Sequence, residues 1–474
     1  MATPALTHYE RKRLENIRRN GEMMAALKLH HKANELSSAA KRSRIEIKSF
    51  KTDLEKKKPK VEVPIVIRRS LRSRGLPPDA STSSGLEDDL LPSPRRFHSQ
   101  SSPLRSPIDR SGPLTLQEAH SGGSTDRLLM DTILGMSENA PLCWRKQTEE
   151  GSFSGFKLES LTLKEQNVAR LVRGRILNVR FLPSGARTVI MVGDKFGNVG
   201  FWDVDCKEGE GEGIYMYSPH SAPVSGISVQ PFSLSKIFTS CYDGFIRLMD
   251  VGEERFSVIY SGDEAIFSLS QQPEETGCLY FSEGKGRFNI WDLRTRKAST
   301  SFSLHRERIN SIDFNPANTN LIATSSTDGT VCIWDLRSMK KSAPKSVSTV
   351  THKKAVHSAY FSPTGSYLAT TSMDNTIGLV SGVDFADTSM ISHYNQTNRW
   401  ISSFRAIWGW DDSYLFLGNM KRAVDVVSTL DRTTTSLVSS HMTAIPCRFA
   451  VHPFMIGALA GATAGGQVYM WMSG

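Results

Sequence analysis

The chain has 474 residues, of which 39% are hydrophobic, so it is long enough for one large folded domain with a tail. Its net charge of +10 is concentrated near the N-terminus, because residues 1–112 hold 24 Lys and Arg against 13 Asp and Glu. The sequence has no run of 18 apolar residues and no charged-then-apolar leader, which argues against membrane and secreted proteins. We therefore expect no membrane partner.

Residues 1–36 predict a basic amphipathic helix. The segment THYERKRLENIRRNGEMMAALKLHHKANEL (7–36) is rich in helix-forming residues, and its apolar side chains share one face: Leu14, Ile17, Met24 and Leu27. Two interpretations remain open. The segment folds only on a protein partner, or its basic side lies on nucleic acid.

Residues 37–125 have the composition of a disordered linker, basic at first and rich in Ser and Pro later. The first part contains a compact cationic run, which consists of Lys56, Lys57, Lys58 and Lys60. Such a run favours nuclear import, and hence a nuclear protein, although a solvated charge cluster is the alternative. In IRRSLRSRGLPPD (67–79), arginines alternate with small residues, which suits a linear docking motif or an arm that grips phosphates.

Residues 126–161 read as a lead-in, and residues 162–474 as the main domain. The stretch ATSSTDGTVCIWDLR (323–337) predicts two strands joined by an Asp-Gly turn. Comparable apolar runs recur every 42 to 47 residues and end at Trp202, Met249, Trp291, Trp334, Val380, Val427 and Trp471. This period is typical of four-stranded propeller blades, and three of the runs end in the Trp-Asp pair of WD repeats. The predicted fold class is therefore all-β, a seven-bladed WD-repeat β-propeller.

The ring is expected to close with a strand from the N-terminal side of the domain. The last apolar run, QVYMW (467–471), reads as the third strand of its blade, and only three residues follow it. The segment NVARLV (167–172) is then expected to supply the fourth strand. A propeller closed in this way has only short edges.

No motif predicts an enzyme. The six cysteines lack the C-x-x-C spacing of zinc sites, so we expect reduced structural thiols, no metal ion and no cofactor. We expect His305, His352 and His441, which open blades, each to bond a buried Ser or Asp and to support the blade tryptophan. Ser326, Asp328 and Trp334 would complete such a network. No Ser/His/Asp set and no Gly-rich phosphate loop has motif support.

Blade topology divides the loops between two faces. With the strands of a blade called a to d, the d–a connections and b–c turns share one face, and the other loops share the opposite face. Basic residues gather on the first face: Arg173, Arg175, Lys195, Lys285, Arg306, Arg308, Lys353, Lys354, His357, Arg399, Lys421 and Arg422. Acidic residues gather on the opposite face: Glu208, Glu210, Glu212, Glu253, Glu254, Glu274, Glu275, Asp384, Asp387, Asp411 and Asp412. This asymmetry favours DNA on the basic face, unless acids of neighbouring loops neutralise the cations.

One connection has an unusual composition. SHYNQTNRWISSF (392–404) contains amides, a cation and an indole, at Asn395, Gln396, Asn398, Arg399 and Trp400. Amides can bond base edges or phosphates, and an aromatic ring beside an arginine can stack on an unstacked base. Alternatively, Trp400 is the first buried residue of the next strand.

Six sequence segments resemble the WD-repeat protein 76 family, whose yeast members are changed-mutation-rate proteins and whose propeller is related to damage-specific DNA-binding protein 2. They are YERKRLENIRRN (9–20), RRSLRSRGLPPD (68–79), GDKFGNVGFWDV (193–204), WDLR at 291–294 and 334–337, and NQTNRWISSFRAIW (395–408). The resemblance implies a nuclear, chromatin-associated protein that binds DNA, with a preference for damaged duplex. Its basic face would then contact DNA, and chromatin proteins would be further partners.

The resemblance also implies a second partner. In that family, W-D-x-R boxes dock damage-specific DNA-binding protein 1, the adaptor of cullin 4 ubiquitin ligases. Arg294 and Arg337 end such boxes here. They would lie on the face opposite the DNA, as a substrate receptor requires. A structural pairing with an acid of a neighbouring blade is the alternative, and a chromatin-bound interaction scaffold is the alternative function.

Overall fold

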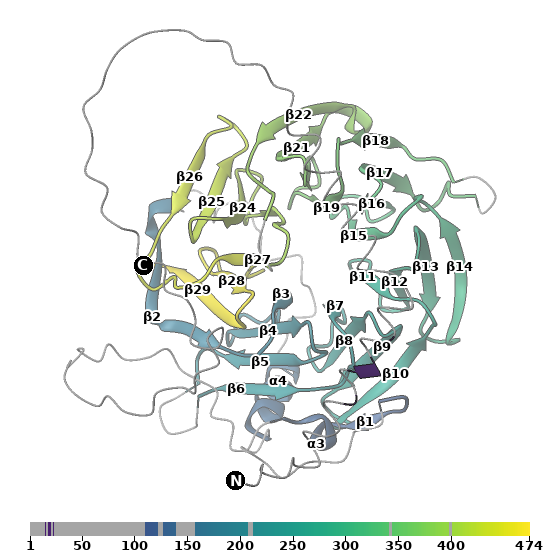
Figure 1. Ribbon diagram of the computed structural model, residues 1–474, viewed down its shortest axis with the longest axis vertical. Helices are drawn as coiled ribbons and strands as arrows, with labels where there is room; N and C mark the ends of the chain where they lie inside the picture. Colours follow the sequence, from purple (N-terminus) through teal and green to yellow (C-terminus); the bar gives the residue numbers. More distant parts are fainter. Residues whose placement is uncertain are drawn as a thin grey trace. The chain divides into compact units, whose positions relative to one another are not determined.

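The chain folds into a seven-bladed β-propeller, as the sequence predicted (Figure 1). The computed structural model describes residues 15, 18, 19, 22, 110–121, 127–138, 157–206, 212–340, 344–397 and 401–474. The chain divides into two units, Met1–Asp88 and Asp89–Gly474. The four described residues of the first unit are helical, and Arg18 Nε lies 3.8 Å from Glu22 Oε1. The proposed import lysines, Asn398, Arg399 and Trp400 fall outside the described residues.

The blades are antiparallel sheets, and in blades 1 to 6 the four main strands follow one another in the sequence. Blade 1 consists of β3 (Ile176–Phe181), β4 (Val189–Asp194), β5 (Val199–Asp203) and β6 (Ile214–Tyr217). Blade 2 consists of β7 (Val224–Val229), β8 (Lys236–Cys241), β9 (Phe245–Asp250) and β10 (Arg255–Ser261). Blade 3 consists of β11 (Ile266–Ser270), β12 (Cys278–Glu283), β13 (Arg287–Asp292) and β14 (Lys297–Ser303). The predicted ends of the apolar runs all lie in third strands, where an apolar side chain packs between neighbouring blades.

Blades 4 to 6 repeat this order. Blade 4 consists of β15 (Ile309–Phe314), β16 (Leu321–Ser326), β17 (Thr330–Asp335) and β18 (Ser348–Thr351). Blade 5 consists of β19 (Val356–Phe361), β20 (Leu368–Ser372), β21 (Thr376–Ser381) and β22 (Asp387–Ser392). Blade 6 consists of β23 (Ile407–Trp408), β24 (Tyr414–Asn419), β25 (Ala423–Ser428) and β26 (Thr434–Leu437). Short 3-10 turns occupy Leu158–Ser160 and Val383–Phe385. The innermost strand of blade 6, β23, has only two residues, because a long connection precedes it.

Blade 7 closes the ring with strands from both ends of the domain. It consists of β27 (Pro446–Val451), β28 (Leu459–Thr463), β29 (Gln467–Ser473) and, as its outer strand, β2 (Leu161–Arg170). The register pairs Val168 with Tyr469 and Leu163 with Trp471. The expected closing strand is thereby confirmed. The core lies between the blades: Trp202 of blade 1 shares a buried cluster with Ala460 and Met470 of blade 7.

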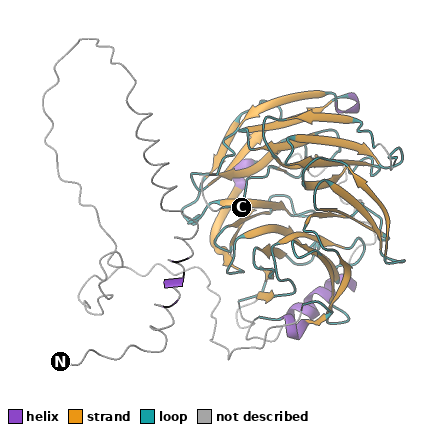
Figure 2. Ribbon diagram, turned by 45° about the vertical axis from the view of Figure 1, so that its right-hand side comes forward, coloured by secondary structure: helices purple, strands orange, loops and turns teal. Residues whose placement is uncertain are grey.

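The sequence predicted a disordered linker up to residue 125, but residues 110–121 contain a strand and a short helix. Strand β1 (Leu114–Thr115) pairs with β10 as a fifth strand of blade 2, and the short helix α3 (Leu116–Ala119) follows it. Thr115 caps that helix in a reciprocal pair with Glu118. Helix α4 (Arg127–Glu138) buries its apolar face in the cluster shared by blades 1 and 2, where Figure 2 shows it against the strands. Among the described residues, no helix has the length and hydropathy needed to cross a bilayer.

Candidate nucleic-acid interface

The b–c turns and the d–a connections meet on one face of the ring, because the same backbone hydrogen bond joins them in successive blades. Leu304 N–H donates to Gly286 O (2.9 Å), and His352 N–H donates to Gly329 O (2.8 Å). Equivalent bonds run from His220 to Gly197, from Gly262 to Gly244, from His393 to Asn375 and from Leu171 to Gly466. We call this surface the basic face. Its exposed cations are Arg173, Lys195, Lys285, Arg306, Arg308, Lys353, Lys354, Lys421 and Arg422.

Acids of neighbouring loops neutralise the basic face in one place. Lys285 Nζ lies 3.9 Å from Glu307 Oε1, and Arg287 Nη2 lies 2.8 Å from Glu264 Oε2. Both pairs are solvent-exposed, so each contributes at most about 1 kcal/mol. They reduce the positive potential above blade 3, whereas the ion pairs among the described residues include none of Lys195, Arg308, Lys353, Lys354, Lys421 and Arg422.

Exposed aromatic rings accompany the cations, which the sequence analysis missed. Lys195 Nζ lies 4.5 Å from the ring centre of Phe196, and the Phe196 side chain is 56% exposed. The Arg308 guanidinium lies 5.3 Å from the ring centre of Phe267. Tyr242 and Tyr394 add two more partly exposed rings on this face. A large aromatic residue inside a turn, where no core position requires one, is the signal that predicts such rings. Bases can stack on them, and cations beside them can reach phosphates.

Two predicted contacts are wrong in their side-chain placement. Asn395 is only 1% exposed, and its amide nitrogen donates to Ser372 O (2.9 Å) and Thr376 O (3.0 Å). It therefore fixes the connection rather than facing a ligand. His357 is buried in β19, where burial and then the charges of Arg405, Arg448 and Arg308 lower its pKa to about 3. It is neutral at pH 7 and adds no charge to the basic face.

Two further predicted contacts are half-buried. The Gln396 backbone N–H donates to Asn375 Oδ1 (3.3 Å). The half-buried side chain of Gln396 is then the group of this residue that could still contact DNA. Arg175 has a buried Nε for which the described residues provide no hydrogen-bond acceptor.

The opposite face contains both predicted adaptor arginines. Arg294 follows β13 and Arg337 follows β17, so they occupy the same turn in adjacent blades, and both are exposed. Asp335 accepts two hydrogen bonds from the Arg337 guanidinium, at 3.1 and 2.8 Å. Asp292 instead accepts the backbone N–H groups of Arg294 and Thr295. Each WD aspartate therefore orders the turn from which the arginine projects.

The opposite face is mixed rather than acidic, in contrast to the prediction. Exposed Glu253, Glu254, Glu274, Asp384 and Asp387 lie on it as expected. However, it also presents exposed cations: Arg255, Arg294, Arg296, Lys297, Arg337, Lys340, Lys345 and Arg432. Glu253 forms an ion pair of 2.6 Å with Arg255. Exposed Glu212 also belongs to this face, whereas Glu208 and Glu210 fall outside the described residues. Among the charges that the structure describes, the asymmetry of the ring therefore comes mainly from the basic face.

A complete hydrogen-bonded network supports blade 4. His305 bonds Asp328 (3.2 Å) and Thr324 Oγ1 (2.7 Å), and Trp334 Nε1 donates to the same Thr324 hydroxyl (2.8 Å). Burial alone would raise the pKa of Asp328, but hydrogen bonds from His305 and Thr330 outweigh it and hold this pKa well below its usual range. Thr324 rather than Ser326 joins His305 to Trp334, while the Ser326 hydroxyl accepts the Asp328 N–H (3.2 Å) and donates to Glu307 O in the loop.

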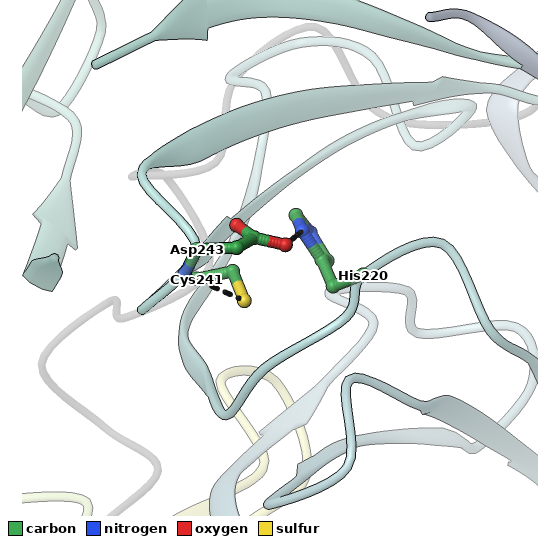
Figure 3. A group of neighbouring side chains, drawn as sticks. All are labelled: His220, Cys241 and Asp243. Atoms are coloured by element: carbon green, nitrogen blue, oxygen red, sulfur yellow. Dashed lines mark hydrogen bonds and ion pairs between the residues drawn. The ribbon is translucent and has the colours of Figure 1, made fainter. Parts of the chain in front are cut away.

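His220, Cys241 and Asp243 form the corresponding group of blade 2, and their side chains point toward one another (Figure 3). His220 bonds Asp243 and Thr239, and the Cys241 thiol donates to Ala222 O (3.0 Å). Burial, together with the charge of Asp243, raises the pKa of the Cys241 thiol far above its usual range. The hydrogen bonds of this trio are those of a blade support, because His220 joins Asp243 to Thr239 as His305 joins Asp328 to Thr324 in blade 4.

Comparisons with known proteins agree with this architecture. The family model described as "WD domain, G-beta repeat" matches residues 296–335 and 344–381. The chain is 29% identical to WD repeat-containing protein 76 of Xenopus laevis, over 98% of this chain and 80% of that protein. It is 27% identical to the mouse protein of the same name, over 98% and 74%. It is 26% identical to the DNA damage-binding protein CMR1 of Kluyveromyces lactis, over 97% and 98%.

Proposed function

Because this chain is a WD-repeat homologue of WD repeat-containing protein 76 and DNA damage-binding protein CMR1, we propose that it is a nuclear, non-enzymatic receptor that binds DNA, including damaged duplex, through its basic face. The observation that supports this proposal most strongly is the gathering of nine exposed cations, with aromatic rings among them, in loops that share one face. Phosphates bound there would release counterions, which yields salt-dependent affinity without catalytic groups.

The test removes cations that have no acidic partner among the described residues. The double variant Lys353→Glu, Lys421→Glu is expected to weaken binding to a short duplex about a hundredfold at 100 mM salt, and to flatten the slope of log affinity against log salt by roughly two. Fluorescence anisotropy over a salt series, with intact and damaged duplex, measures both quantities. The matched control Lys340→Glu, Lys345→Glu changes the net charge equally on the opposite face and should bind as the wild type does.

An unchanged slope in the Lys353/Lys421 variant would refute DNA binding by this face. If bare duplex also failed to displace a bound chromatin protein, the alternative scaffold function would be favoured instead.

The same proposal includes adaptor docking on the opposite face. The exposure of Arg294 and Arg337 in equivalent turns of adjacent blades supports a protein contact there, with damage-specific DNA-binding protein 1 and the cullin 4 ligase as the partners that the family resemblance implies. A receptor needs its adaptor on the face away from its target, and these arginines meet that requirement.

The double variant Arg294→Ala, Arg337→Ala is expected to reduce pull-down of damage-specific DNA-binding protein 1 by about tenfold or more, since loss of two charge-assisted contacts costs at least 1.5–3 kcal/mol. Duplex binding should stay unchanged. As a control, Arg255→Ala with Arg432→Ala removes two exposed arginines from other turns of the same face. Equal pull-down by both double variants would discard the docking role.

A further inference from the structure

The central channel of the ring contains two arginines without carboxylate partners. Arg448 lies in β27, and its guanidinium donates to Leu177 O (2.9 Å), Cys447 O (3.0 Å) and Ser403 O. Arg405 precedes β23 and donates to Tyr360 Oη (3.3 Å) and Asn310 O (3.1 Å). All of these acceptors are neutral oxygens. The ion pairs found among the described residues include neither arginine.

The positions of the Arg405 and Arg448 charges lower the stability of the folded protein. Burial, and then the neighbouring charge of Arg405, lowers the pKa of Arg448 to about 9. The same arginines help to keep His357 neutral. Within the part of the chain that the structure describes, the buried Nε of Arg405 also lacks a hydrogen-bond acceptor. Arg405 and Arg448 are half-buried, and charges of one sign in a partly dry site repel each other, so an anion between them would offset part of this cost.

Both arginines line one cavity of about 340 Å3 inside the ring. Its wall also includes Asp313, Tyr360 and Trp408. The lining residues reach the last positions of strands β3, β19, β23 and β27, which lead into the a–b connections. The cavity therefore extends toward the face opposite the basic face. This volume suits a small ligand and is far too small for a duplex.

Asp313 is the acidic residue that lines this cavity, and the ion pairs among the described residues do not join it to Arg405 or Arg448. Its Oδ2 accepts the Phe361 N–H (2.7 Å), and the cation that acts on it is Arg180 of β3. Burial raises the pKa of Asp313 to about 7 despite these contacts, so the carboxyl group is partly neutral at physiological pH. The positive charge of the cavity is thus not cancelled from within.

We propose that the cavity around Arg405 and Arg448 binds a small phosphorylated compound, with the two guanidinium groups holding adjacent phosphate oxygens. Planar guanidinium groups match phosphate oxygens in pairs, and charge-assisted bonds in a partly dry site are the stronger ones. The Tyr360 hydroxyl would keep its hydrogen bond with Arg405 and so hold that guanidinium group in position. The residues of this site differ from those of the DNA-binding surface.

The probe is inorganic pyrophosphate, titrated calorimetrically into the full chain at constant ionic strength, with orthophosphate and sulfate as separate arms. We expect pyrophosphate to bind more tightly than sulfate, and Arg405→Gln to weaken it about tenfold or more, as the loss of a charge-assisted pair implies. The Lys353→Glu, Lys421→Glu variant should bind pyrophosphate as the wild type does, whereas Arg405→Gln should keep the wild-type salt slope with duplex. Orthophosphate binding as tightly as pyrophosphate would still support the site but limit it to a single phosphate group.

The proposal is overturned if the wild type binds pyrophosphate no better than sulfate, or if the Lys353/Lys421 variant loses binding while Arg405→Gln retains it. Should Arg405→Gln fail to fold, the wild type itself decides the question. Phenylglyoxal modifies accessible arginines, and mass spectrometry locates the products. Pyrophosphate should slow modification of Arg405 and Arg448 but not of exposed Arg432, and equal rates with and without pyrophosphate would contradict the proposed site.

Discussion

Gly286→Ala is expected to destabilise the propeller by about 3 kcal/mol or more, because two costs combine. Gly286 has a φ of +65° in the b–c turn of blade 3, a conformation that costs a non-glycine residue about 1–2 kcal/mol. In addition, a Cβ there would overlap the carbonyl oxygen of His305 in the adjoining connection. The turn would have to move away from that connection and break the Leu304 N–H to Gly286 O hydrogen bond. Urea denaturation followed by tryptophan fluorescence measures the loss.

Gly329→Ala is the matched control, since Gly329 occupies the same turn position in blade 4. Its φ is +87°, but the nearest atom to an added Cβ is His352 O at 3.0 Å, so only a small shift is needed. We expect a loss of about 1–2 kcal/mol there. Asn375 and Arg422 adopt positive φ at this position in blades 5 and 6, which indicates that φ alone is tolerated. Equal losses in the two variants would contradict the role given to the His305 carbonyl.

The glycine turns also explain why the fold was predictable from sequence. Each blade repeats one hairpin with its own turn residues. A pattern that is weak evidence in one blade therefore predicts the fold well when it recurs at a steady period. The closing strand was predictable because QVYMW (467–471) reads as a third strand and NVARLV (167–172) as an outer strand, and β2 does pair with β29. Strand β1 was not predictable in this way. Leu114–Thr115 stands in a Ser/Pro-rich context, and its structure depends on a distant edge strand together with Arg247, which donates to Gly112 O (2.8 Å) and Arg110 O.

The site was predicted less completely than the fold, for a related reason. Topology assigned loops to faces correctly, but not the direction of each side chain. Asn395 looked like a ligand-binding amide, yet His393 Nδ1 bonds its Oδ1 (2.7 Å) and two carbonyls accept its amide hydrogens. Arg405 and Arg448 looked like ordinary strand residues, since nothing in their spacing shows that strands 43 residues apart bring them to one cavity.

Thr324→Val is expected to destabilise the protein by about 3 kcal/mol, because it leaves two buried donors or acceptors without partners. Thr324 Oγ1 bonds both His305 Nε2 (2.7 Å) and Trp334 Nε1 (2.8 Å), and the residue is fully buried. Valine has nearly the same shape, so the packing is retained and the loss reports on the hydroxyl. The free energy of unfolding in urea is the measurement.

Thr239→Val provides the control in blade 2. Thr239 is equally buried and bonds His220 Nε2 (2.9 Å), but Met249 stands where blade 4 has Trp334, so only one group loses its partner. The expected loss is about 1–2 kcal/mol, and a loss equal to that of Thr324→Val would refute the bridging role of the Thr324 hydroxyl. In the intact network His305 bonds Asp328, which also accepts the Arg306 N–H (3.2 Å). Faster hydrogen exchange across residues 304–308 in Thr324→Val would therefore connect the blade core to the loop that presents Arg306 and Arg308 on the basic face.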